Sequence, residues 1–453
     1  MSFTRTNEGI PLYPVSSDNY EQWLANMSGA QQKWLKTAGF RAQPGELCSL
    51  PDSNGELQGY VFGMAKQGWL YQLAPLPAKL AAGNYRLVTD WEPEQRTQAC
   101  LGWGLACYQF TLYRKAQKKM PTLALDDDIA TGVEQLLTAQ SLVRDLVNTP
   151  TEDLGPAQLA DALQLEADQF GATMSVIHGV DLLTKNFPAI HAVGRASHRE
   201  PRLLKLEWGE EHHPLLALCG KGVCFDTGGL NMKAGTGMAL MKKDMGGAAH
   251  VVALARLIMQ AKLPVRLLVL IPAVENSISG NAYRPGDVIP TRKGLSVEIG
   301  NTDAEGRIVL ADALTYACEH KPDLVIDFAT LTGAARVALG TDLPPIFSNK
   351  LSTANEITAV GDAEEDPLWV MPLYQPYKEL LESPIAHLNN MGKNAFGGCI
   401  VAALFMEHFV NPETEWVHID TWAWNQNNRP GRPLGGEAIG LRAVFRYLKM
   451  RYC

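Results

Sequence analysis

Two short stretches of this chain contain the residue types that hydrolytic metal centres use. Residues 301–307 read Asn-Thr-Asp-Ala-Glu-Gly-Arg, and residues 220–247 set charged side chains among glycines. Together they supply four carboxylates, two lysines and one arginine: Asp226, Asp244, Asp303, Glu305, Lys221, Lys233 and Arg307. Four anions can share one small pocket only if cations neutralise them. A pair of divalent metal ions does this most simply, so these residues favour a two-metal hydrolase.

The glycine-rich stretch at residues 220–229 is open to two other interpretations. A lysine between glycines, as at Lys221, suggests phosphate binding, but the order is not the Gly-x-x-x-x-Gly-Lys-[Ser/Thr] of a P-loop. Residues 226–228 read Asp-Thr-Gly, the tripeptide of aspartic proteases, which need two such carboxylates that share a proton. The chain has no second copy of the tripeptide, so an aspartic protease is disfavoured.

Some of the charged residues also have purely structural interpretations. Asp244 precedes a predicted helix and could cap its amino terminus. Its neighbours Lys242 and Lys243 are most simply solvated surface charges. Each of these interpretations needs no ligand.

The heptapeptide itself allows two geometries. Asp303, Glu305 and Arg307 alternate along the chain, so an extended segment would place all three on one side. Alternatively, they form a structural ion pair at the start of a helix, where carboxylates favour the helix dipole.

The pattern of apolar segments predicts the elements that must position these residues. Buried strands are expected at 215–218, 267–271 and 324–326, and helices at 247–259 and 308–317. This alternation indicates an α/β domain with a central mixed, largely parallel sheet flanked by helices. Sites in such sheets form beyond the carboxyl ends of strands. Residues 221–226 directly follow one predicted strand, and residues 330–333 follow another.

The 453 residues are too many for one ordinary core, so two domains are expected. Residues 1–125 contain short strand-like runs, at 59–62 and 85–88, and predict a smaller α/β amino-terminal domain. Residues 126–150 carry apolar side chains at helical spacing and predict a linker helix. The catalytic domain is then expected at 151–453.

Composition excludes several classes of protein. The net charge is −8 and no basic run is present, which argues against a nucleic-acid-binding role. No apolar run reaches the roughly 20 residues of a membrane helix, and residues 1–23 lack the apolar core of a signal peptide. The eight cysteines contain no Cys-x-x-Cys pair, so reduced thiols and a cytoplasmic location are expected.

Taken together, these segments resemble one known family. Residues 301–307 look like the hallmark of the leucyl aminopeptidase family of two-metal cytosolic exopeptidases, and the spacing of the charged residues in 221–244 is similar to that family's metal-binding segment. The match continues through 308–314 and 327–333 and covers roughly residues 130–450, whereas the amino-terminal third resembles the family only weakly. The resemblance implies a metal-dependent aminopeptidase that releases amino-terminal residues from peptides.

The resemblance also implies residue roles. A tighter metal would be held by Lys221, Asp226, Asp244 and Glu305, and a more exchangeable metal by Asp226, Asp303 and Glu305. The two ions would be Mn²⁺ or Zn²⁺, with Mg²⁺ or Co²⁺ possible, and a hydroxide that bridges them would attack the substrate. Lys233 would polarise the scissile carbonyl, and Arg307 would hold a bicarbonate ion as general base.

The same resemblance implies a pocket for the first side chain, lined by Met241, Thr330 and Gly333, and a substrate contact to the Leu331 carbonyl. Family members are typically hexamers, which implies a homo-hexamer here. One departure concerns Trp422, which stands where the family usually has a small residue. Either Trp422 reshapes the pocket, or it packs with Trp424 in a core away from it.

Two further functions stay open at this point. The same carboxylates could serve metal-assisted phosphoester hydrolysis, although the sequence lacks a phosphate cradle. Some members of the resembled family also bind DNA, but the acidic charge balance weighs against this role here.

Overall fold

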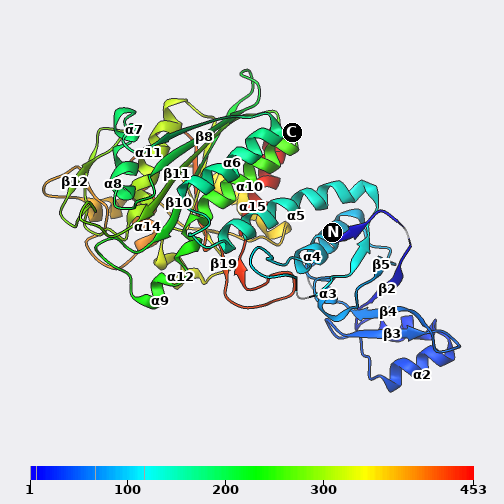
Figure 1. The fold of residues 1–453 in the computed structure, drawn as a ribbon. Coiled ribbons are helices and arrows are strands. Elements are labelled where there is room, and N and C mark those ends of the chain that lie inside the picture. Colours follow the sequence, from blue (N-terminus) through cyan, green and yellow to red (C-terminus); the bar gives the residue numbers. More distant parts are fainter. Residues whose placement is uncertain (1, 7, 67, 117) are drawn as a thin grey trace. The chain divides into compact units, whose positions relative to one another are not determined.

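The computed structural model describes residues 2–6, 8–66, 68–116 and 118–453. The chain forms two compact units (Figure 1). The first comprises Met1–Ser141 and Gln426–Leu434, and the second comprises Leu142–Asn425 and Gly435–Cys453. The division falls inside the long helix α5 (Asp127–Asn148), which lies where the sequence predicts a helix.

The first unit contains a six-stranded sheet in the order β1-β6-β5-β2-β4-β3. All pairings are parallel except that of β3 with β4. Its strands are β1 (Phe3–Thr4), β2 (Ile10–Val15), β3 (Leu47–Pro51), β4 (Leu57–Gly63), β5 (Asn84–Leu87) and β6 (Thr122–Ala124). Its helices are α1 (Tyr20–Ala25), α2 (Gly29–Thr37), α3 (Leu76–Lys79) and α4 (Pro93–Ala106). The expected smaller α/β sheet is therefore present; β4 contains the strand predicted at 59–62, and β5 overlaps the one predicted at 85–88 as far as Leu87.

The second unit is built on a nine-stranded sheet in the order β16-β15-β18-β14-β9-β11-β8-β7, with β10 also paired to β11. The pairings among β18, β14, β9, β11 and β10 are parallel, whereas β15, β8 and β7 add antiparallel strands on the two sides. The parallel strands are β9 (Leu215–Gly220), β10 (Gly222–Asp226), β11 (Arg266–Asn276), β14 (Leu324–Ala329) and β18 (Trp416–Asp420). The outer strands are β7 (Thr173–His178), β8 (Arg202–Trp208), β15 (Pro345–Ser348) and β16 (Trp369–Val370). This confirms the predicted mixed, largely parallel sheet.

Helices cover both faces of this sheet (Figure 1). One group consists of α6 (Pro156–Phe170), α10 (Gly246–Gln260) and α15 (Leu441–Tyr452), and the other of α8 (Pro188–Gly194), α11 (Glu305–Glu319) and α14 (Gly398–Glu407). Side chains of α8, α11 and α14 form a large apolar core with the sheet. Because β9, β11 and β14 are buried on both faces, they carry the continuous apolar runs seen in the sequence.

The remaining elements of the second unit are mostly short, apart from α13. They are α7 (Asp181–Thr184), α9 (Gly235–Met238), the 3₁₀ helices η1 (Met241–Met245) and η2 (Gln375–Leu381), α12 (Gly333–Leu339) and α13 (Leu351–Ala363). A three-stranded sheet contains β12 (Val288–Pro290), β13 (Ser296–Glu298) and β17 (Leu388–Asn389), and β19 (Trp424–Asn425) pairs with β20 (Gly435–Gly436). None of the described helices is long and apolar enough to cross a lipid bilayer.

Glycine lets helix α10 approach the sheet closely. A Cβ atom on Gly247 would lie 2.1 Å from the Phe328 carbonyl oxygen of β14. The Ala248 amide donates to the Lys221 carbonyl at 2.8 Å, and the Lys221 amide donates to the Phe328 carbonyl at 3.0 Å. The start of α10 and the residue after β9 are thereby fixed to the end of β14.

Because the central strands are parallel, their carboxyl ends lie together, and several polar residues are found there. Lys221 follows β9, Asp226 ends β10, Asn276 ends β11, Thr330 follows β14 and Asp420 ends β18. Ligand sites in open α/β sheets form beyond these carboxyl ends. The fold therefore places the chemically interesting segments together.

Candidate metal and active site

Three carboxylates form a buried cluster at these carboxyl ends. One oxygen from each of Asp226, Asp244 and Glu305 lies within 4.8 Å of the other two. Asp226 ends β10, Asp244 lies in η1, and Glu305 is the first residue of α11. Each residue is at most 3% exposed. Carboxylates this close and this buried need a cation, and the cluster fits a metal site.

Lys221 is the nearest cation in the described chain. Its Nζ lies 2.7 Å from Asp244 Oδ2 and 2.9 Å from Glu305 Oε1, and it donates to the Thr330 carbonyl at 2.9 Å. Burial acts to lower the pKa of Lys221, but the carboxylates of Asp244, Glu305 and Asp226 outweigh it and raise the pKa. With only these carboxylates around it, the Lys221 side chain is therefore protonated.

Lys233 forms a second bridge. Its Nζ lies 2.8 Å from Asp226 Oδ2 and 2.5 Å from Asp303 Oδ1. Burial acts to lower the pKa of Lys233, but the charges of Asp226 and Glu305 and the hydrogen bonds to Asp226 and Asp303 together outweigh it and raise the pKa. Asp303 is more exposed than the other carboxylates, so the site has a closed side at Lys221 and a more open side at Asp303.

Two carboxyl groups hold protons more tightly than usual. Burial, together with the Asp226 carboxylate, raises the pKa of Glu305 to about 8 and that of Asp303 to about 6. Glu305 Oε2 is buried and has no hydrogen-bond partner within the described residues. An unpartnered buried carboxylate oxygen is costly, and a bound cation would satisfy it.

A hydrogen-bonded framework orients the carboxylates. Asp226 Oδ1 accepts from the Gly228 amide and from Asn276 Nδ2, both at 2.8 Å. Asn276 also donates to the Thr302 carbonyl at 3.0 Å, and Tyr283 donates to the same carbonyl at 2.6 Å. Gly228 has φ +88°, and a Cβ there would lie 3.0 Å from Asp303 Oδ1, so the turn requires glycine.

The segment 303–307 is not extended, so the proposed same-side alternation is wrong. Asp303 lies in a turn and Glu305 begins α11. Residues two apart on a helix do not face each other, and Arg307 forms no ion pair with Asp303 or Glu305 in the described structure. The alternative holds in part: Glu305 begins α11 and forms an ion pair there, but its partner is Lys221 and not Arg307.

Arg307 lies beside the cluster and is held by the backbone. Its Nη1 donates to the Asn390 carbonyl at 2.8 Å, whereas its buried Nε has no partner in the described part of the chain. Burial lowers the pKa of Arg307 to about 10. The guanidinium thus keeps donors available for an anion.

Thr330 and the loop after it form the neighbouring wall. Thr330 Oγ1 donates to Asp244 Oδ1 at 2.8 Å and to the Asp244 carbonyl oxygen at 2.9 Å. Asp420 Oδ1 accepts from the amides of Leu331 and Thr332, and its Oδ2 accepts from the Thr332 hydroxyl at 2.6 Å. The loop ends at Gly333, the first residue of α12.

Met241 completes this side of the candidate site. It begins η1, the 3₁₀ helix that also carries Asp244, and it is buried. Of the predicted pocket residues, Thr330 contacts Asp244 directly, Leu331 and Gly333 follow Thr330 along the chain, and Met241 shares η1 with Asp244.

Two structural interpretations of residues 242–244 are wrong. Asp244 does not cap α10, because the N-cap is Met245 and no side chain caps that helix end. Lys243 is not solvated but 1% exposed, since η1 turns it inward, and burial lowers its pKa to about 7. Lys242 is half-buried and donates to the Asn148 carbonyl at 2.5 Å, so it is not a free surface charge either.

Two basic side chains lie close to the ring of Trp422. Lys243 Nζ is 3.9 Å from the centroid of its ring, and the guanidinium carbon of Arg336 is 3.8 Å from that centroid. Trp424 is buried, with Lys242 Nζ 5.6 Å from its ring. Trp422 itself is only partly buried, and its Lys243 neighbour precedes Asp244. The two tryptophans therefore do not share a core remote from the acidic cluster.

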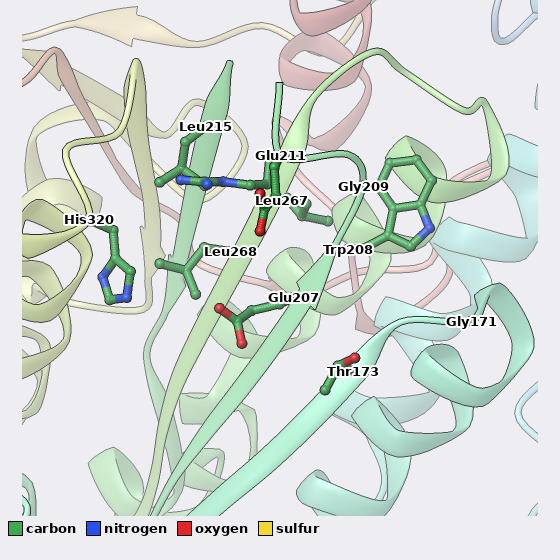
Figure 2. Close-up of a pocket in the computed structure, with 11 residues that line it drawn as sticks. Gly171, Thr173, Glu207, Trp208, Gly209, Glu211, Leu215, Leu267, Leu268 and His320 are labelled. Atoms are coloured by element: carbon green, nitrogen blue, oxygen red, sulfur yellow. The ribbon is translucent and has the colours of Figure 1, made fainter. Parts of the chain in front are cut away.

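A separate cavity of about 360 Å³ lies at the amino-terminal ends of β9 and β11, away from the carboxyl ends where the acidic cluster lies (Figure 2). It is lined by the first residues of β9 and β11, by Glu207 and Trp208 of β8, and by His320. None of the predicted site residues lines it.

Sequence reasoning did not single out several residues of the site. Asn276, Thr302 and Arg336 lie outside the motifs or carry no distinctive spacing. The one available signal was position, because Asn276 lies a few residues after the predicted strand at 267–271. The roles of these residues depend on which strands are neighbours in the sheet, and the sequence alone does not reveal the strand order.

Comparisons with known proteins agree with this geometry. Residues 141–445 match the catalytic domain of the cytosol aminopeptidase family, and residues 10–126 match the M17 aminopeptidase N-terminal domain. The "Probable cytosol aminopeptidase" of Desulfovibrio desulfuricans is 40% identical over 392 residues, which are 82% of this chain and 76% of that protein. The protein of the same name from Rhodopirellula baltica is 35% identical over 442 residues, 89% of this chain and 85% of its own length.

Solved structures give the same result. The cytosol aminopeptidase from Coxiella burnetii is 47% identical, with a TM-score of 0.97 over 100% of this chain and 99% of that one. The bottromycin maturation enzyme BotP in complex with Mn is 29% identical, with a TM-score of 0.88 over 98% of this chain and 99% of that one. This chain therefore belongs to the M17 cytosol (leucyl) aminopeptidase family of metalloexopeptidases.

Proposed function

We propose that this protein is a metal-dependent aminopeptidase that removes amino-terminal residues from peptides at the cluster of Asp226, Asp244 and Glu305. The observation that carries this proposal is the buried acidic cluster flanked by Lys221 and Lys233. Family membership supports the peptide substrate, and a relative that binds Mn supports a divalent cation at the site.

The donor set fits two divalent ions. Lys221, Asp226, Asp244 and Glu305 would hold the tighter ion, and Asp226, Asp303 and Glu305 the more exchangeable one. Two dications balance the four carboxylates, and the unpartnered Glu305 Oε2 gains a ligand. When bound, the ions supply Lewis acidity and lower the pKa of water from ~15.7 to near neutrality. Mn²⁺ or Zn²⁺ suits these oxygen and nitrogen donors, as do Mg²⁺ and Co²⁺.

Lys221 can bind a metal only as a neutral amine. Its pKa is raised by the surrounding carboxylates, so metal binding has to release its proton. Once two dications neutralise those carboxylates, the cause of the raised pKa is removed, and burial then favours the neutral amine.

The remaining basic residues have separate tasks. Lys233 lies at the open side of the cluster and polarises the scissile carbonyl, stabilising the oxyanion that develops on it. Arg307 holds a bicarbonate ion that serves as general base, and its unpartnered Nε supports a bound anion. Met241, Thr330, Gly333 and Trp422 line the pocket for the first side chain, and the Leu331 carbonyl accepts from the substrate amide.

Family membership also supports a cytoplasmic homo-hexamer. The net charge of −8 gives no support to nucleic-acid binding. Light scattering on the purified chain tests the assembly, and a monomer would contradict it.

Activity tests the proposal directly. Hydrolysis of an aminoacyl p-nitroanilide panel should appear with Mn²⁺, vanish after exhaustive chelation and return on re-addition. Asp303→Ala should abolish it, whereas Asp287→Ala, at an exposed Arg284 ion pair, should not. Activity on phosphoesters but on no aminoacyl amide would overturn the proposal in favour of a phosphoesterase.

A further inference from the structure

Arg336 is a cation without an ion pair at the wall of the candidate site. It lies in α12, and its Nη1 donates to the Thr332 carbonyl at 3.0 Å, which folds the side chain back over the start of its own helix. No carboxylate of the described chain lies within ion-pair distance of Arg336. The charge of the nearby Asp420 acts on the guanidinium electrostatically. Both Asp420 side-chain oxygens already accept hydrogen bonds from residues 331 and 332. The guanidinium therefore keeps unused donors.

These donors face the proposed pocket. A Cβ atom on Gly333 would lie 3.5 Å from Arg336 Nη2 and in contact with no other group within 4 Å. Gly333 is exposed and follows the loop that contacts Asp244 through Thr330. The space above Gly333 is thus open to a ligand and bordered by the guanidinium.

Trp422 packs against Arg336 and holds it in place. The guanidinium carbon lies 3.8 Å from the indole centroid, and Lys243 Nζ lies 3.9 Å from the same centroid. The indole Nε1 is buried and has no hydrogen-bond partner among the described residues. Trp and Arg side chains are donors only, so the polar groups that stay unpaired here, the indole Nε1 and the remaining guanidinium N–H groups, are donors.

We propose that Arg336 and Trp422 select an acidic amino-terminal residue, so that peptides beginning with Glu or Asp are preferred to those beginning with apolar residues. This inference rests on the proposed aminopeptidase function and names its substrate class. A carboxylate at the end of the first side chain would accept from the Arg336 guanidinium, and the bulk of Trp422 would narrow the space available to a leucine side chain. The same positive charge disfavours Lys and Arg at that position.

The test compares kcat/KM for aminoacyl-coumarin amides of Glu, Gln, Leu and Lys. Glu and Gln have nearly the same shape, so their ratio isolates the charge. The wild-type protein should favour Glu over Gln and over Leu, and Lys should be the poorest. Because a hydrogen bond to a charged group is stronger than one between neutral groups, Arg336→Met should lower the Glu-to-Gln ratio by on the order of tenfold or more.

Two further variants separate recognition from structure. Arg336→Lys keeps the charge and should restore part of the ratio, whereas Trp422→Ala should raise kcat/KM for Leu. Arg446→Met should leave the ratio unchanged, because Arg446 is an exposed residue of α15 whose ion-pair partner is Glu364, directly after α13.

The outcomes distinguish the two proposals. Turnover of Leu with a Glu-to-Gln ratio near one, unaltered in Arg336→Met, overturns the inference and leaves the aminopeptidase intact. A lower melting temperature of Arg336→Met with an unchanged Glu-to-Gln ratio would show that the contact between Arg336 and Trp422 serves only stability. That result also overturns the inference. Absence of turnover for the whole panel with Mn²⁺ overturns the aminopeptidase itself.

Discussion

The side chain of Lys221 lies directly against the backbone of Gly306. A Cβ atom on Gly306 would come within 2.7 Å of Lys221 Cε and 2.8 Å of its Nζ. The glycine between Glu305 and Arg307 therefore leaves room for the lysine that pairs with Glu305. This relationship explains in physical terms why the heptapeptide needs glycine at this position.

Gly306→Ala should displace Lys221 and weaken metal binding. The lysine is pinned between Asp244, Glu305 and the Thr330 carbonyl, so it cannot move aside at little cost. Disturbing the support of a metal ligand typically lowers affinity by about 10–100-fold. Titration with Mn²⁺ followed by calorimetry measures this change. Gly280→Ala, where a Cβ would meet nothing within 4 Å, is the matched control, and equal affinity in both variants would refute the packing argument.

Metal binding should release protons at pH 7. Glu305, with a pKa of about 8, and Lys221, with a raised pKa, both bind protons that a metal must displace. Calorimetry in buffers of different ionisation enthalpy should give a release of roughly one proton or more per chain. Lys221→Met should release fewer protons than the wild-type protein. A binding enthalpy that is independent of the buffer would show that neither group loses a proton.

In chelator, the protein should lose stability as the pH rises from about 5 to 8. The folded-state pKa values of Asp303 and Glu305, about 6 and about 8, exceed those of the unfolded chain, about 3.9 and 4.3. The folded state therefore binds more protons, and its stability is fully present below the unfolded pKa values and falls through the folded ones. Melting curves at several pH values measure this slope.

The control for the pH dependence is Glu305→Gln, which cannot ionise. It should flatten the slope in chelator without removing it, because burial also raises the pKa of Asp312 to about 7. In the wild-type protein, excess Mn²⁺ should reverse the slope, since deprotonated ligands bind metal more tightly. A slope unchanged by either treatment would show that the cluster does not set the pH dependence.

Lys233→Met should lower kcat far more than it changes KM. A donor that stabilises a developing oxyanion acts mainly in the transition state, and its loss typically costs about 10²–10³ in kcat. Steady-state kinetics on the best substrate of the panel give both constants. Lys205→Met, at an ion pair with Glu207 on β8, is the control. A rise in KM at constant kcat would assign Lys233 to ground-state binding instead.

Much of the fold could be predicted from the sequence. The buried strands β9, β11 and β14 are continuous apolar runs, and α10 and α11 lie where apolar residues recur at helical spacing. Strand order could not be predicted in the same way, because β9 lies between β11 and β14, which come from distant parts of the chain. Local patterns do not specify such pairings.

The grouping of site residues was partly readable as well. Asp226, Asp244 and Glu305 meet as expected from charge and spacing, although their roles as ligands stay predictions. The burial of Lys243 could not be predicted from the sequence, because a pair of lysines next to an aspartate usually lies on a solvated surface. Arg336 carried no signal, since its importance depends on the ring of Trp422, far along the chain.

The most direct test of the account is the number of metal ions that the chain binds. Equilibrium dialysis against Mn²⁺, followed by elemental analysis, should give two ions per chain in the wild-type protein and one in Asp303→Asn, which would lose only the exchangeable ion. Asp287→Asn should retain two. One ion in the wild-type protein, or two in Asp303→Asn, would contradict the two-metal centre.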